Sequence, residues 1–120
     1  MMEVRYLLDE NMAPEWRTQL LRNRPGLMVW MIGDPSAPRQ GTLDPEILIW
    51  CEERQFLLVT NNRRSMPNHL ADHLANNRTI PGILTLRKNA VMGETIGDLL
   101  LIADIGAGEE FKNQIRYIPL

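Results

Sequence analysis

The chain has 120 residues, of which 44% are apolar and 23% are charged, and its net charge is −2. A chain of this length builds one hydrophobic core, so we expect residues 1–120 to form a single domain. The composition excludes disordered and collagen-like proteins, and the small negative charge excludes a polycation that coats nucleic acid with its whole surface.

Strand and helix signals alternate along the first half of the chain. The apolar run at residues 4–8 predicts a strand, and apolar residues at helical spacing predict a helix that begins at Pro14 and is stopped by Pro25-Gly26. Residues 27–32 predict a second strand. The segment 33–42, rich in proline and glycine, predicts an exposed loop or flap. Next, Asp44-Pro45-Glu46 predicts the start of a helix that runs to about Arg54.

The same alternation continues to the end of the sequence. Strands are predicted at 56–60, at 83–86 and, more weakly, at 115–118, with a short helix over 67–77 and a longer one over 93–105 between them. Such alternation is typical of parallel strands joined by right-handed crossovers. The predicted fold is therefore an α/β, three-layer Rossmann-like fold, with a mostly parallel four- or five-stranded sheet and helices on both faces.

Polar residues gather where the carboxyl ends of the predicted strands should meet. Ligands bind at this edge of parallel sheets, at the point where the winding reverses direction. If the first strand is central, its acids face the residues that follow the third strand, and the start of the helix at 44 can reach the same rim. The rim would carry Asp9, Glu10, Asn11, Asp44, Glu46, Thr60, Asn61, Asn62, Arg63 and Arg64.

These residue types predict a site for a hard cation and a phosphate. Carboxylate and amide oxygens suit Mg²⁺ or Mn²⁺, and adjacent carboxylates raise each other's pKa unless a cation lies between them. Arg63 and Arg64, with Arg39 from the flap, can bind phosphate groups with or without a metal. A metal-assisted phosphodiester reaction needs this pairing, because a metal ion activates water and absorbs charge while carboxylates hold the ion.

Each acid also has a purely structural interpretation. The stretch Asp9-Glu10-Asn11 makes a good turn and cap for the helix that follows, and Asp44 is a favourable helix cap. Glu46 complements the dipole of the first helical turn. Asp72 offers a further acid on the next helix, although we favour a solvated helix position for it.

Three motifs resemble a known protein family. They are YLLDENMAP, LDPEILIWCEERQFLLVTNN and PGILTL, which lie in order between residues 4 and 86. This pattern is similar to that of small bacterial PIN-like domains of uncharacterised type, related to the PIN ribonucleases of toxin–antitoxin systems. The resemblance implies a Mg²⁺ or Mn²⁺ site with Asp9 as the first ligand, Glu10 and Asn11 beside it, and Asp44 and Glu46 as the helix-start acids.

The chain departs from the family pattern after the third strand. Asn62 and Arg64 stand where the family has aspartates, and Ser65 stands where phenylalanine is usual. An amide keeps an oxygen ligand but removes a unit charge, and an arginine adds a positive charge near the cation. Both departures weaken a metal site, so the resemblance leaves an active and an inactive form open.

Other signals point to ordinary structure. His69 and His73 lie one helical turn apart but lack the glutamate of a zinc protease motif, so we expect surface or cap histidines. Cys51 is the one cysteine and is expected to pack in the core. A signalling receiver domain would need an aspartate at the end of the third strand, where this chain has Asn61-Asn62.

We therefore predict a cytoplasmic PIN-like protein with no membrane partner, since the longest apolar runs are too short to span a bilayer and the N-terminus lacks a signal pattern. The first hypothesis is a metal-dependent endoribonuclease, in which Asp9 and Glu46 hold the ion while Asp44 and Asn62 assist. The alternative is an inactive PIN-like module that binds RNA or a protein, such as an antitoxin-like partner or a second copy of the chain.

Overall fold

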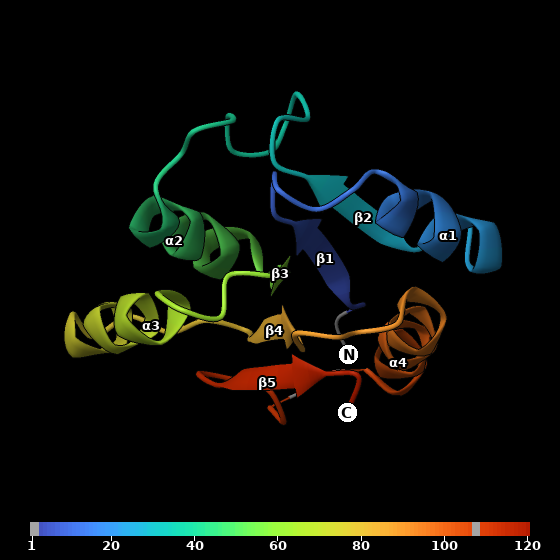
Figure 1. The fold of residues 1–120 in the computed structure, drawn as a ribbon. Coiled ribbons are helices and arrows are strands. Elements are labelled where there is room, and N and C mark those ends of the chain that lie inside the picture. The colour runs from blue at the N-terminus through green and yellow to red at the C-terminus, as the bar shows by residue number, and fades with distance from the viewer. Residues whose placement is uncertain (1–2, 107–108) are drawn as a thin grey trace.

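The computed structural model describes residues 3–106 and 109–120, which form five strands and four helices in strict alternation (Figure 1). The elements are β1 (Arg5–Leu8), α1 (Glu15–Asn23), β2 (Met28–Met31), α2 (Asp44–Arg54), β3 (Leu57–Thr60), α3 (Met66–Ala75), β4 (Ile83–Leu86), α4 (Met92–Ile105) and β5 (Ile115–Ile118). The predicted α/β class is confirmed.

All five strands pair in parallel in one sheet, with the order β2-β1-β3-β4-β5. The chain passes from β1 outward to β2 and then returns to β3 on the other side of β1. The direction of winding therefore reverses between β1 and β3, as the sequence-based site prediction required. The carboxyl ends of these two strands form the switch point at which open parallel sheets bind ligands.

Apolar side chains alternate between two layers, one on each face of the sheet. Leu7 and Leu58 pack with the inner faces of α2 and α3, whereas Leu8 and Val59 pack with those of α1 and α4. Figure 1 shows the two helix pairs on opposite sides of the sheet, which gives the predicted three layers. Burying each of these side chains contributes about 1.5–3 kcal/mol of transfer free energy, which is why the central strands read as continuous apolar runs.

Two buried contacts fix the segments around the sheet. The Tyr6 hydroxyl donates a hydrogen bond of 2.7 Å to the Leu99 carbonyl oxygen, so β1 is tied to α4. Gly82 precedes β4 with a φ of +155°, and a Cβ there would lie 2.8 Å from the Cβ of Phe111. A glycine is therefore needed for the chain before β5 to lie this close to β4.

Within residues 3–106 and 109–120, the helices lack the length and apolar character of a membrane-spanning segment.

Candidate functional site

Asp9 lies directly after β1 at the switch point, and only 7% of its surface is exposed. Its backbone N–H donates to the Val59 carbonyl oxygen at 3.0 Å, which extends the pairing between β1 and β3 by one residue. One carboxylate oxygen accepts a hydrogen bond from the Glu10 N–H at 2.7 Å, and the other accepts one from the Thr60 hydroxyl at 2.8 Å. These two bonds fix the orientation of the carboxylate and leave lone pairs on both oxygens.

The environment of Asp9 opposes its negative charge. Burial raises the pKa of its carboxyl group above the usual range, and the charges of Asp44 and Glu10 add to the rise, while the hydrogen bonds from Thr60 and Glu10 partly offset it. Among the described residues, no lysine or arginine forms an ion pair with Asp9. A buried acid beside two other acids is the arrangement that a bound cation stabilises.

Asn62 connects the two strands of the switch point to α2. Its backbone N–H donates to the Thr60 hydroxyl at 3.1 Å, and its side-chain amide donates to an Asp44 carboxylate oxygen at 3.0 Å. The same amide nitrogen lies 2.8 Å from the Ser65 hydroxyl, and the amide oxygen accepts from the Ser65 N–H at 3.2 Å. Hydrogen bonds thus link the Asp9 carboxylate to the Thr60 hydroxyl, that hydroxyl to the Asn62 backbone, and the Asn62 side chain to Asp44.

The predicted capping roles of the acids are wrong. Asp44 is the first residue of α2 and makes no capping hydrogen bond, because its carboxylate instead accepts from Asn62 and lies 3.5 Å from the His69 ring nitrogen. The stretch after β1 does form a turn, closed by the Met12 N–H and the Asp9 carbonyl oxygen. It does not cap α1, which begins after Pro14 without a side-chain cap.

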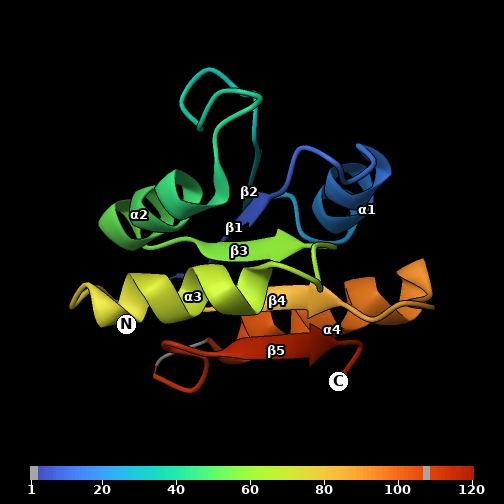
Figure 2. The same ribbon diagram turned by 60° about the vertical axis from the view of Figure 1, so that its left-hand side comes forward.

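Glu10 attaches the flap, residues 33–42, to the turn after β1. Its carboxylate accepts a hydrogen bond of 2.9 Å from the Gly41 N–H, near the end of the segment 33–42. Asp34 anchors the other end of the flap through a 2.6 Å ion pair with Arg17 of α1. Figure 2 shows the flap rising above the sheet between α1 and α2, at the edge where β1 ends. The predicted exposed loop therefore has two defined attachments.

The remaining predicted site residues lie around this centre. Arg63 donates from Nη1 to the Leu86 carbonyl oxygen at 3.1 Å, so its guanidinium lies at the end of β4. Glu46 is exposed on the first turn of α2, and it is Asp44 rather than Glu46 whose charge acts on Asp9. The other predicted residues are exposed; they are Asn11, Arg39, Asn61 and Arg64. Asp72 is also exposed, in the second half of α3.

The donor set suits a hard cation with few protein ligands. Within the part of the chain that the structure describes, no group of three or more His, Cys, Asp or Glu side chains is placed to hold a metal ion. Asp9 and Asp44 offer two carboxylates joined through Thr60 and Asn62. Mg²⁺ is commonly held by one or two carboxylates, with water and substrate phosphate completing its octahedron, so these residues fit that ion.

Ser65 and His69 are site neighbours that the sequence analysis did not assign. Ser65 follows Asn62 by three residues, the spacing at which an Asn side chain bonds a nearby backbone N–H. His69 lies one turn further along, on the face of α3 that meets α2. The spacing from Asn62 was visible in the sequence, but the contact with Asp44 was not.

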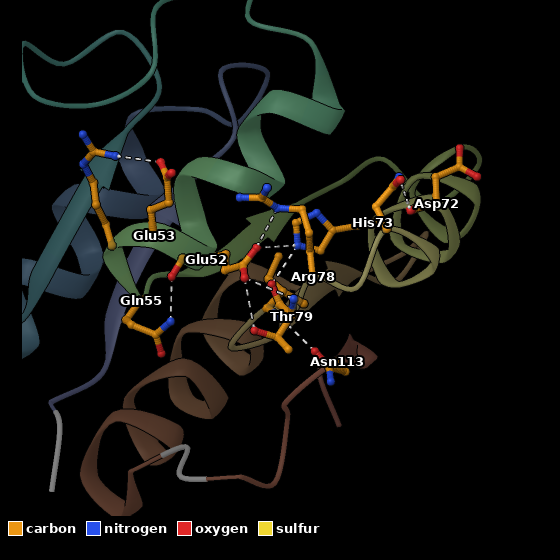
Figure 3. Close-up of polar contacts among 11 residues, drawn as sticks. Glu52, Glu53, Gln55, Asp72, His73, Arg78, Thr79 and Asn113 are labelled. Atoms are coloured by element: carbon orange, nitrogen blue, oxygen red, sulfur yellow. Dashed lines mark hydrogen bonds and ion pairs between the residues drawn. The ribbon is translucent and has the colours of Figure 1, made fainter.

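A second polar cluster lies at the other end of α2 and α3 (Figure 3). His73, whose side chain is 3% exposed, places its Nε2 atom 2.7 Å from the Thr79 carbonyl oxygen and 3.2 Å from a Glu52 carboxylate oxygen. Arg78 donates to the same carboxylate at 2.9 Å. The expectation of surface or cap histidines is therefore wrong for His73, which is buried because it joins α2 to the chain before β4.

The chain matches no protein-family model, no curated protein and no solved structure.

Proposed function

We propose that this protein is a Mg²⁺- or Mn²⁺-dependent endoribonuclease of PIN-like type, with its site at the carboxyl ends of β1 and β3. The observation that carries the proposal is the Asp9 carboxylate, which is buried beside Asp44 and Glu10 with its pKa raised and with no basic ion-pair partner among the described residues. A buried carboxyl group without a basic partner lowers the stability of a fold, so the position of Asp9 favours a role in binding.

Each residue near the site has a distinct role in this proposal. Asp9 and Asp44 hold the ion, and the Thr60 hydroxyl keeps the Asp9 carboxylate in place. Glu46, two residues beyond Asp44 on the exposed first turn of α2, is the next acid available as a ligand. When bound, such an ion would activate the attacking water and stabilise the negative charge on the phosphodiester oxygens.

Cationic side chains at the same edge supply the phosphate contacts. Arg63 is fixed at the end of β4, and Arg64 and Arg39 are exposed on the loop after β3 and on the flap. Arginine suits this role because its planar fork matches two phosphate oxygens at once.

The test measures the effect of Mn²⁺ on the melting temperature and the dependence of RNA cleavage on a divalent ion. Mn²⁺ should raise the melting temperature of the protein, and Asp9→Asn should abolish the rise because it removes the central ligand. Asp72→Asn is the matched control, since it removes an exposed carboxylate of the neighbouring helix and should leave the rise intact. Cleavage of a mixed RNA pool should require the ion. The proposal would be rejected if Mn²⁺ did not raise the melting temperature and the RNA pool was not cleaved.

One observation favours a second candidate, an inactive module that binds RNA or a protein partner. The Asn62 amide donates hydrogen bonds to Asp44 and to Ser65, so an uncharged N–H donor already occupies one carboxylate oxygen of Asp44. This candidate predicts a stable homodimer or a co-purified antitoxin-like partner, and no divalent-ion effect. A monomer without a captured partner would count against it.

A further inference from the structure

One row of side chains crosses the sheet on the face covered by α2 and α3. The register pairs Leu8 with Val59, which places Asp9 beside Thr60 at the next position; Thr60 then pairs with Thr85, and Thr85 with Tyr117. Side chains in register on neighbouring strands point to the same face. The row therefore leads from the buried acid after β1, across β3 and β4, to an aromatic ring on the edge strand β5.

The outer end of this row is open to solvent. Tyr117 is 41% exposed, and the Arg87 guanidinium lies over its ring, 6.0 Å from the centroid. In Figure 2, α3 passes in front of the sheet above β5, and β5 itself stays in open view. An exposed ring with an arginine beside it on an uncovered strand is a surface on which a flat, electron-rich group can stack.

Cations border the path between Asp9 and Tyr117. Arg63 is held at the end of β4 by the Leu86 carbonyl oxygen, Arg87 donates to the Pro119 carbonyl oxygen at 2.7 Å, and Lys88 is exposed in the turn that follows. None of these three forms an ion pair with an acid among residues 3–106 and 109–120. Glu94, on the first turn of α4, is the acid that borders the hollow beside Arg87 and Lys88.

We propose that the β4–β5 end of the carboxyl edge binds single-stranded nucleic acid, with Tyr117 stacking on a base and with Arg63, Arg87 and Lys88 contacting phosphates. The proposal rests on the function proposed above and names the form of its substrate. Three strand spacings of about 4.8 Å, about 14 Å in all, separate Tyr117 from Asp9, so a chain that stacks on the ring and also reaches the acidic site is a short oligonucleotide rather than a single nucleotide.

The chemistry selects a single strand over a duplex. Stacking on Tyr117 needs a base whose face is free, and in a duplex that face is covered by its neighbours. The cations lie to one side of the Tyr117 ring along a single edge of the sheet, so they can contact the phosphates of one nucleic-acid strand. Because every base has a π-face, the surface should accept most sequences.

The experiment measures the affinity of the full chain for a labelled oligouridylate by fluorescence anisotropy in EDTA, where no cleavage occurs. The oligouridylate should bind more tightly than a duplex of the same length. Tyr117→Val removes the ring but keeps a strand-forming side chain, and it should weaken binding about tenfold. Tyr117→Phe should bind as the unmodified chain does. Thermal melts of each variant check that the fold is intact.

A charge variant and its control test the phosphate contacts. Arg87→Gln should weaken binding and reduce the slope of log affinity against log salt concentration by about 0.7, the value for one lost single-strand contact. Arg116→Gln is the matched control, because Arg116 lies on the opposite face of β5 and should leave both affinity and slope unchanged. Equal affinity for the duplex, an unchanged affinity in Tyr117→Val, or an equal loss in Arg116→Gln would overturn the proposal.

The outcome is separable from that of the proposed function. Asp9→Asn should bind the oligouridylate at least as tightly as the unmodified chain, because it removes a negative charge and touches no group of the proposed surface. Binding that depends on Tyr117 without any divalent-ion effect would reject the nuclease alone. A Mn²⁺ response without binding at Tyr117 would reject this surface alone.

Discussion

Thr85 offers a direct test of the polar row on the sheet. It is 1% exposed, and within the described residues its hydroxyl is the buried side-chain group that has no hydrogen-bond partner. Thr60, paired with it on β3, is equally buried, but its hydroxyl donates to Asp9 and accepts from the Asn62 N–H. The same substitution, threonine to valine, should therefore have opposite effects at these two neighbouring positions.

The expected magnitudes follow from the partners of each hydroxyl. A buried polar group without a partner costs about 1–3 kcal/mol, so Thr85→Val should raise the free energy of unfolding by about 1 kcal/mol. Thr60→Val removes one of the two hydrogen bonds to the Asp9 carboxylate and leaves the Asn62 N–H without its partner, and it should lower the free energy of unfolding by about 2 kcal/mol. For a chain of this length, each kcal/mol shifts the melting temperature by about 3–6 °C.

Urea unfolding and thermal melts in EDTA measure both variants against the unmodified chain. The dependence of the unfolding free energy on urea should stay constant, so a change in midpoint reports stability rather than compactness. A loss of stability in Thr85→Val would show that its hydroxyl is satisfied in solution, and the reasoning would be refuted. So would a gain in Thr60→Val as large as the gain in Thr85→Val.

Three further outcomes follow from other contacts. The pKa of Asp9 is raised in the folded chain, so its contribution to stability is present below the unfolded pKa of about 3.9 and is lost as pH rises through the folded pKa. In EDTA, the stability of Asp9→Asn relative to the unmodified chain should therefore increase over that rise in pH, as measured from urea midpoints. Partial burial raises the pKa of Glu52, but hydrogen bonds from Thr79 and Arg78 and the charges of Arg78 and His73 together lower it. The stabilisation that Glu52 gives the fold is thus present above about pH 4.3 and is lost as pH falls through the lower folded pKa. Glu52→Gln should therefore destabilise the chain at neutral pH but not in acid. Glu53→Gln, on an exposed 3.8 Å ion pair, should have almost no effect in the same chemical unfolding series. Gly82→Ala should lower the free energy of unfolding by about 2 kcal/mol or more, since the added Cβ would meet Phe111. Gly26→Ala, whose Cβ would have nothing within 4 Å, should change the urea midpoint little. Equal effects of the two substitutions would contradict the close approach at Gly82.

The fold could be predicted from the sequence because its signals are local. The apolar runs that predicted strands end within a residue of the observed bounds, since parallel strands buried on both faces need continuous apolar residues. Likewise, Asp44-Pro45-Glu46 marked the start of α2 correctly. The site prediction depended on β1 lying between β2 and β3, and the strand order meets that condition.

The site was less predictable because its contacts join distant segments. Asp44 was expected to cap its own helix, but Asn62, 18 residues away, takes its carboxylate. His73 carried no sequence signal for burial, since its partners come from α2 and from the chain before β4. Tyr117 reads as an ordinary strand residue, and its relation to Asp9 appears only in the register of four strands.

The contact between Glu10 and Gly41 makes the flap a thermodynamic partner of the acidic site. The carboxylate that holds the flap is also one whose charge acts on Asp9. A ligand that draws Glu10 toward Asp9 must release the Gly41 N–H, and a flap held closed must in turn weaken that ligand by the same factor. The exchange rate of the Gly41 amide therefore reports occupancy of the acidic site, whose Glu10 carboxylate it contacts.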